Sequence, residues 1–462
     1  MRCTRRHFVR QATGALALPL VGASRVLASP QEAFAQFGLV PIARIAPRPS
    51  ISIGASPLSV GYETLDRKLF DPSRTFAHAA QLGVKWARCQ TGWARTEGTP
   101  GQYDFGWLDE VVDGLRRIGI QPWFNLGYGN PLYTLGADET AVGWAPVFDD
   151  HALEAWKRFT AAIAEHFRGR VRHYEIWNEP NITAFWKPGK PDARLYVRLV
   201  AHTAPILRKR VPDAILIGGA LAGVPLGYLK ECLVAGLAKH VDVLSYHPYR
   251  EIPEKNYEAD VQAMRRVLAQ HGASLRLWQG ECGCPSKKGG AGALAQADWN
   301  ETRQAKWLLR RILTDLRLGV ELTSYFLIVD LVGYRGSTNW KGLLRGSDYS
   351  PKPAYFAYQH LCALFDAETC KADIPIRVEG PEAGEAMTVA FLRRGKPLYG
   401  YWTPADLTRQ TPLGQVRVSL GQPLECPVLL DLLSGQIYRL PGLDRLPLAD
   451  YPLLIASART LA

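Results

Sequence analysis

The feature that most constrains the fold of this chain is an alternation of short apolar segments with amphipathic helical segments through residues 55–366. Strands that alternate with helices favour a parallel sheet with helical crossovers, and eight such units favour a closed (β/α)8 TIM barrel of the α/β class. The expected strands lie at 58–62, 84–88, 121–126, 174–179, 214–218, 241–246, 274–280 and 321–327. The expected helices lie at 74–82, 107–118, 151–167, 191–209, 226–236, 256–270, 300–317 and 353–365.

The pattern changes near residue 370. Short strand-like segments follow one another through tight glycine-containing turns, as at 387–391 and 398–402, and helical spacing is absent. This is typical of an antiparallel β-sandwich, which we assign to residues 367–462 as a smaller C-terminal domain. Residues 29–54 form an N-terminal segment that can contribute a strand to this sandwich.

Residues 1–28 have the pattern of a twin-arginine signal peptide. Arg5 and Arg6 are adjacent, Phe8 follows, and a mildly apolar stretch leads to small residues near Ala28. We therefore expect export by the twin-arginine route to the periplasm or the extracellular space. No later segment reaches the ~18 uncharged apolar residues of a membrane span, so the mature chain is expected to have no transmembrane segment.

Charge and cysteine content exclude several classes of partner. Removing the five arginines of residues 1–28 reduces the formal net charge from +12 to +7, and the remaining basic residues are spread along the chain rather than clustered as in nucleic-acid binders. A basic surface and an anionic polysaccharide both fit this balance. The seven cysteines after Cys3 include no Cys-x-x-Cys pair, so we expect most of them to be buried free thiols. With no metal-ligand cluster, phosphate loop or Ser/His/Asp elbow in the sequence, we expect no metal and no cofactor.

Two glutamates each close a short apolar segment. Glu179 stands in Tyr174-Glu175-Ile176-Trp177-Asn178-Glu179-Pro180-Asn181, and Glu281 in Leu275-Arg276-Leu277-Trp278-Gln279-Gly280-Glu281-Cys282-Gly283. They end the fourth and seventh expected strands, and the carboxyl ends of barrel strands meet at one face. Cleavage of a glycosidic bond requires two such carboxyl groups.

The Asn178-Glu179-Pro180 triplet and the Trp278-Gln279-Gly280-Glu281 run resemble the fourth-strand and seventh-strand signatures of the clan A glycoside hydrolases. These are retaining (β/α)8-barrel enzymes. Within the clan, this sequence is most similar to family 39-like and cellulase-like (family 5-type) members. The resemblance covers about residues 55–366, and the C-terminal sandwich is similar to the accessory domain of family 39. It implies that Glu179 is the general acid/base and that Glu281 is the nucleophile.

The resemblance also implies supporting residues around the two glutamates. Asn178 would hydrogen-bond the sugar 2-hydroxyl, and Arg88 would contact the nucleophile. His247 and Tyr249, after the sixth strand, would contact the nucleophile or the substrate. Residues expected on the substrate side, or as stacking platforms, are Asn125, Tyr128, Trp93, Trp186 and Trp340. For Trp186 and Trp340, core packing is an equal alternative.

The sequence thus predicts an exported retaining glycoside hydrolase. Its substrate would be an oligosaccharide or polysaccharide with β-linked sugars, cleaved through a covalent glycosyl-enzyme. A non-hydrolytic carbohydrate-binding barrel is an alternative, and transglycosylation would use the same intermediate. Xylosides, β-glucans, uronic-acid-containing chains and an exopolysaccharide all remain open as substrates.

Overall fold

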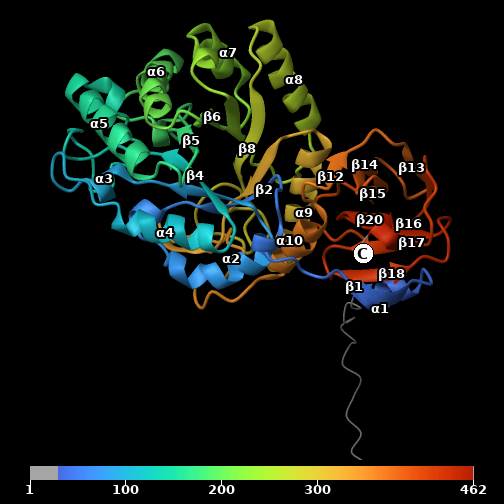
Figure 1. Cartoon of the computed structure of the whole chain (residues 1–462). Helices are drawn as coiled ribbons and strands as arrows, with labels where there is room; N and C mark the ends of the chain where they lie inside the picture. Colours follow the sequence, from blue (N-terminus) through green and yellow to red (C-terminus); the bar gives the residue numbers. More distant parts are fainter. Residues whose placement is uncertain (1–29, 461–462) are drawn as a thin grey trace, which may run out of the picture.

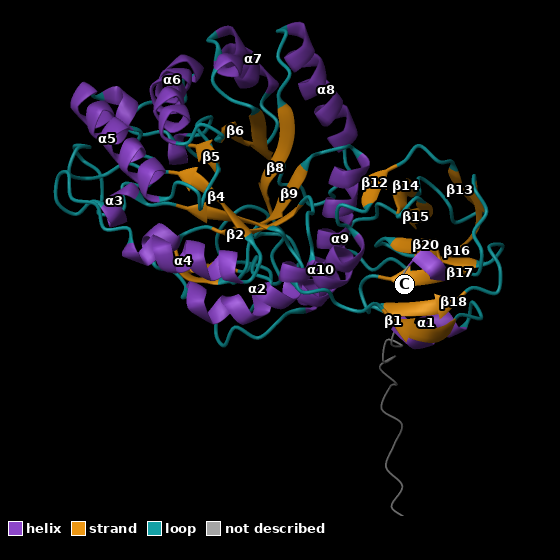
Figure 2. Ribbon diagram, in the orientation of Figure 1, coloured by secondary structure: helices purple, strands orange, loops and turns teal. Residues whose placement is uncertain are grey.

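The computed structural model describes residues 30–460, so the expected signal peptide lies outside the described residues. Eight parallel strands close into a barrel in sequence order, which confirms the predicted fold (Figure 1; Figure 2). They are β2 (Leu58–Tyr62), β3 (Trp86–Gln90), β4 (Gln121–Leu126), β5 (His173–Ile176), β6 (Ile215–Ala222), β7 (Val243–His247), β8 (Arg276–Cys282) and β9 (Leu322–Tyr325). The helices around it are α2 (Phe76–Leu82), α3 (Trp93–Thr96), α4 (Gly106–Arg117), α5 (Asp150–His166), α6 (Ala193–Arg210), α7 (Leu226–Val234), α8 (Tyr257–Gln270), α9 (Glu301–Arg317) and α10 (Pro353–Leu364).

Local signals fix where several of these helices begin and end. The side chains of Asp149, Asp192 and Asn300 each accept a hydrogen bond from a backbone N–H in the first turn of α5, α6 and α9. Such caps satisfy N–H groups that have no partner within the helix. Gly83 ends α2 at φ 89, a conformation that favours glycine. The helices therefore start and stop close to the positions that the sequence predicts.

The barrel interior is filled by two layers of different character. The aromatic layer contains Trp86, Trp123, His173 and Trp278, and Trp123 and Trp278 pack edge-to-face at 5.4 Å. In each strand the residue two positions further toward the carboxyl end is polar or glycine, and these are Arg88, Asn125, Glu175 and Gly280. Because side chains alternate along a strand, these residues share the inward face. A polar layer therefore lies on the side of the barrel where active sites form.

The C-terminal domain consists of two antiparallel sheets, which confirms the predicted sandwich. The larger sheet has the order β1-β18-β17-β20-β15-β14-β12 and the smaller one β13-β16-β19. The N-terminal strand β1 pairs with β18, so this sheet combines both ends of the described chain. The strands are β1 (Val40–Arg44), β12 (Thr369–Lys371), β13 (Ile376–Glu379), β14 (Met387–Arg393), β15 (Lys396–Trp402), β16 (Gly414–Leu420), β17 (Pro427–Asp431), β18 (Gln436–Arg439), β19 (Leu446–Leu448) and β20 (Leu453–Ser457).

Helices α9 and α10 lie on the side of the barrel that faces the sandwich (Figure 1). An ion pair joins Lys306 of α9 to Asp450 at 2.7 Å. A small hairpin, β10 (Leu331–Tyr334) with β11 (Ser337–Asn339), follows β9. No helix within residues 30–460 is both long and apolar enough to cross a lipid bilayer.

Candidate active site

Glu179 is held in an uncommon backbone conformation just after β5. Trp177 and Glu179 have φ values of 72 and 45, in the left-handed region that costs a non-glycine residue free energy. Neighbouring strands hold this turn, because Trp177 N donates to Leu126 O at 3.1 Å and Glu179 N donates to Ala220 O at 2.9 Å. The turn directs the Glu179 side chain over the open end of the barrel, where 12% of it is exposed.

Glu281 occupies the next-to-last position of β8, so the strand continues past the end at residue 280 that the sequence predicts. Its side chain is 13% exposed. The preceding residue must be small, because a Cβ atom at Gly280 would come within 2.2 Å of Ser245 Oγ and 3.2 Å of Glu175 Oε1. The glycine lets β8 lie close to the polar layer and places Glu281 at its rim.

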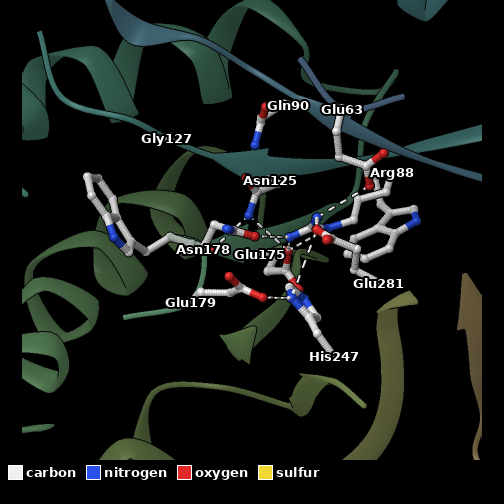
Figure 3. Close-up of polar contacts among 12 residues, drawn as sticks. Glu63, Arg88, Gln90, Asn125, Gly127, Glu175, Asn178, Glu179, His247 and Glu281 are labelled. Carbon is white, nitrogen blue, oxygen red and sulfur yellow. Dashed lines mark hydrogen bonds and ion pairs between the residues drawn. The ribbon is translucent and has the colours of Figure 1, made fainter. Parts of the chain in front are cut away.

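The two glutamates face each other across His247, the last residue of β7 (Figure 3). His247 Nδ1 lies 3.0 Å from Glu179 Oε1 and 3.9 Å from Glu281 Oε2. One carboxylate oxygen of Glu179 lies within 4.8 Å of one of Glu281. Retaining glycosidases hold their carboxyl groups ~5–5.5 Å apart, whereas inverting ones hold them ~6.5–9.5 Å apart to admit a water. The separation fits the retaining arrangement.

Arg88 organises the polar layer beneath the pair. Its guanidinium group is fully buried and donates to Glu281 Oε2 at 2.7 Å, to Glu175 Oε2 at 2.9 Å and to Glu63 Oε1 at 3.3 Å. It also donates to Asn178 Oδ1 at 2.8 Å, which fixes the side chain beside Glu179. The planar fork of an arginine can serve this many acceptors, whereas a lysine ammonium cannot hold the same geometry.

The surroundings of Glu281 favour its charged form. Burial alone would raise its pKa, but the neighbouring His247 and Arg88 and the hydrogen bond from Tyr249 outweigh burial and hold the pKa below its usual value. Tyr249 Oη donates to Glu281 Oε1 at 2.8 Å. An ionised carboxylate with both oxygens held in place is suited to act as a nucleophile.

Glu63 and Glu175 are residues of this network that our sequence analysis did not identify. Burial raises the pKa of Glu63 to about 8, and the attraction of Arg88 only partly offsets this effect. Its Oε2 atom is buried and has no hydrogen-bond partner among the described residues. Strand alternation is the signal that would have found both, because Glu63 follows Ser59 and Gly61 on the inward face, and Glu175 lies inside β5.

Two residues expected near the substrate instead support the site from below. Asn125 is fully buried, and its Nδ2 donates to Glu175 Oε2 at 2.9 Å and to Trp177 O at 2.7 Å. Tyr128 is 1% exposed, and its hydroxyl accepts a hydrogen bond from Gln90 Nε2 at 3.1 Å. Both therefore stabilise the turn and loop that carry the reacting groups.

The expectation that Trp93 lies on the substrate side is wrong, because its side chain is fully buried. Trp186 is also fully buried, which confirms the core-packing alternative for this residue. Trp93 stacks on Phe159 at 5.6 Å and donates through its indole N–H to Glu97 at 2.5 Å. Trp186 packs edge-to-face on Trp177 at 6.1 Å, behind the Glu179 turn. Trp340 is half-buried, with the Lys287 ammonium 5.2 Å from its ring centre.

Glu179, His247 and Glu281 are also the only group of potential metal ligands found within residues 30–460 at suitable spacing. The side chains of this cluster already have hydrogen-bond and ion-pair partners within the protein. Arg88 and Tyr249 donate to the two oxygens of Glu281, and Glu179 Oε1 lies at hydrogen-bonding distance from His247. The hydrogen bonds of this cluster therefore suit two carboxyl groups that exchange protons and attack a substrate carbon.

Comparisons with known proteins agree with this geometry. Residues 70–271 match the family model of the glycosyl hydrolases family 39. A β-xylosidase of Geobacillus stearothermophilus is 28% identical over 157 residues, which cover 32% of this chain and 31% of that protein. A β-xylosidase of Caldicellulosiruptor saccharolyticus is 25% identical over the same length and the same shares. The matched segment thus spans about a third of each of these curated relatives.

Solved structures show the same fold over most of the chain. A family 39 glycoside hydrolase from Bacteroides cellulosilyticus WH2 superposes with a TM-score of 0.68 at 21% identity, covering 87% of this chain and 81% of that one. A monomeric β-xylosidase from Caulobacter crescentus CB15 gives 0.62 at 18% identity, covering 90% and 98%. Over residues 70–271 this chain is therefore similar to the family 39 glycoside hydrolases, and it shares their fold over most of its length.

Proposed function

We propose that the protein is a retaining glycosidase that cleaves β-linked O-glycosidic bonds through a covalent glycosyl-enzyme. The observation that carries this proposal is the separation of at most 4.8 Å between a Glu179 oxygen and a Glu281 oxygen, at the open end of the barrel. That spacing is closer to the retaining separation of ~5–5.5 Å than to the inverting separation of ~6.5–9.5 Å. Two of the curated relatives are β-xylosidases and a third is a β-galactosidase, so a β-xyloside is the first substrate to test and a β-galactoside the second.

In the first step the Glu281 carboxylate would attack the anomeric carbon. The bond from that carbon to the leaving oxygen breaks, and Glu179 gives its proton to this oxygen. Arg88 and Tyr249 hold the attacking carboxylate, and Asn178, fixed by Arg88, lies next to the acid. In the second step Glu179 takes a proton from water, the water oxygen attacks the anomeric carbon, and Glu281 leaves with the configuration retained.

Hydrolysis of an aryl β-D-xyloside by the mature protein and by Glu281→Gln tests this assignment. The substitution should remove turnover by several orders of magnitude while the protein stays folded. A 2-deoxy-2-fluoro xyloside should label wild-type Glu281, which peptide mass spectrometry would locate. Glu231→Gln is the control, because Glu231 is an exposed residue of α7 that lies outside the catalytic pair. Full activity in Glu281→Gln, or an inverted first product seen by NMR, would overturn the proposal.

A panel of chromogenic glycosides and soluble polysaccharides would define the sugar. Glycan binding without turnover on every substrate would favour a carbohydrate-binding barrel instead. Longer products at high substrate concentration would indicate transglycosylation through the same intermediate.

We also propose that the protein is exported by the twin-arginine route, on the strength of the Arg5-Arg6 pair and the apolar stretch after it. Replacing both arginines with lysine should retain the protein in the cytoplasm. Unchanged export of that variant would contradict the twin-arginine assignment.

A further inference from the structure

The loop between β7 and α8, residues 248–256, connects the active site with the β-sandwich. It begins immediately after His247 and carries Tyr249, which holds the nucleophile. The loop is fixed to α9 of the barrel at two backbone positions. Trp307 Nε1 donates to Arg250 O at 2.8 Å, and Arg311 Nη1 donates to Pro253 O at 3.1 Å.

The far end of the loop reaches the sandwich through a buried cluster of Glu254, Arg310 and Trp402, which we call the domain latch. Arg310 donates to both oxygens of Glu254, at 2.8 and 2.6 Å, and Trp402 Nε1 donates to Glu254 Oε1 at 2.7 Å. Arg310 is fully buried, and the Glu254 side chain is 4% exposed. Trp402 closes β15 of the sandwich and is also fully buried.

Arg310 also contacts the sandwich directly, because its Nη1 donates a hydrogen bond to Ala405 O at 2.7 Å. Burial alone would raise the pKa of Glu254, but the ion pair with Arg310 and the bonds from Arg310 and Trp402 hold the pKa below its usual value. A buried carboxylate with these partners is fixed in one geometry, because losing any one of them leaves a charge without compensation.

We propose that the β-sandwich is part of the catalytic unit, because the domain latch fixes loop 248–256 and thereby the position of Tyr249 against Glu281. Glu254 and Trp402 are then positioning residues that act through Tyr249. This inference rests on the proposed glycosidase function. The sandwich would then help to hold Glu281 in position, in addition to packing against the barrel.

The test is a double-mutant cycle between the domain latch and Tyr249, with kcat/KM on an aryl β-D-xyloside as the readout. Trp402→Phe removes the indole N–H and keeps a ring. It should lower kcat/KM about tenfold in the wild-type background, the effect of weakening a hydrogen bond to a charged group. In the Tyr249→Phe background it should cost about twofold or less, because the two changes act on one interaction. Equal losses in both backgrounds would overturn the proposal.

Two further measurements separate positioning from a general loss of stability. The acid limb of the kcat/KM profile should move to higher pH in Trp402→Phe and in Glu254→Gln, since Tyr249 then stabilises ionised Glu281 less.

Lys306→Met breaks the Lys306–Asp450 ion pair of the same domain interface without touching the loop, and it should leave kcat/KM and the acid limb unchanged. If wild type turns over the xyloside and the latch variants behave like Lys306→Met, the positioning role fails and the glycosidase function stands. If wild type cleaves no glycoside, the function itself fails.

Discussion

Arg88 donates through one nitrogen to both Glu281 and Glu63, at 2.7 and 3.3 Å, so Glu281 shares its cation with a buried neighbour. Glu175 takes up the other side of the same guanidinium group. Three carboxyl groups around one buried positive charge cannot all ionise at low cost. The weakly held Glu63 is the member whose raised pKa, about 8, lets it keep a proton.

Arg88→Lys should therefore reduce both stability and activity. The ammonium group cannot serve Glu175, Asn178 and Glu281 together, so part of the buried negative charge loses compensation. We expect a loss of about 3–5 kcal/mol in the free energy of unfolding. The acid limb of the profile of kcat/KM against pH should also move to higher pH, because ionised Glu281 loses a stabilising cation. Unchanged thermal unfolding together with an unchanged pH profile would contradict this role.

Glu63→Gln should flatten the dependence of stability on pH. Between the ordinary pKa of 4.5 and the folded value of about 8, the native state keeps a proton that the unfolded state releases. Stability is therefore lost as pH rises through this window, by on the order of 4 kcal/mol for one such group. Urea unfolding at pH 5 and pH 8 should show a smaller difference in Glu63→Gln than in wild type. Glu231→Gln, which removes an exposed carboxyl group of α7, is the control and should keep the wild-type difference.

Glu179→Ala should separate the two catalytic steps. With a 2,4-dinitrophenyl glycoside the leaving group needs no acid, so the glycosyl-enzyme still forms and then hydrolyses slowly without a base. Added azide should accelerate turnover and give a glycosyl azide of retained configuration. With a poor leaving group, activity should be lost. Equal losses for both leaving groups, with no effect of azide, would show that Glu179 is not the acid/base.

Gly280→Ala should strain the barrel beside the nucleophile. The added methyl group would lie 2.2 Å from Ser245 Oγ, and overpacking of this kind costs about 1–3 kcal/mol. Activity should fall as well, because Glu281 is the next residue. Adding Ser245→Ala removes the clashing oxygen and should restore part of the melting temperature. Failure of this second change to raise it would mean that the clash does not limit stability.

Trp93→Ala should act on stability rather than on substrate binding. The ring is fully buried among Tyr133, Trp156 and Phe159, and removing such a ring costs about 3–5 kcal/mol. The KM of the remaining folded protein should stay near the wild-type value. A large rise in KM with unchanged unfolding would instead restore Trp93 as a sugar platform.

The barrel could be predicted from the sequence because its signal is periodic. Each strand is a short and mostly apolar segment, and each helix has one apolar face. Gly83 and Gly119 mark the ends of two of these helices. The strands of the smaller sheet were harder to find, because β13 and β16 are half exposed and carry weaker patterns. Their pairing depends on partners far away in the chain.

The site was predictable only in part, and for a physical reason. Glu179 and Glu281 stand beside residues that break a strand, and that marks them in the sequence. Glu63 and Glu175 have no such marker, because their importance comes from sharing Arg88, a contact between three strands. Trp93 shows the opposite error, and Trp186 was left open between core packing and stacking, since an aromatic residue in a loop gives no sign of whether the chain will fold over it.

The pairing of β1 with β18 also has a consequence for how the protein is made. Val40 is matched with Arg439, so β1 waits for β18, about 400 residues later in the chain, before one of its edges is covered. Contacts this distant in sequence form slowly, and an unpaired edge invites association with other chains. A nascent or truncated chain can therefore complete its barrel while its amino-terminal strand is still bare.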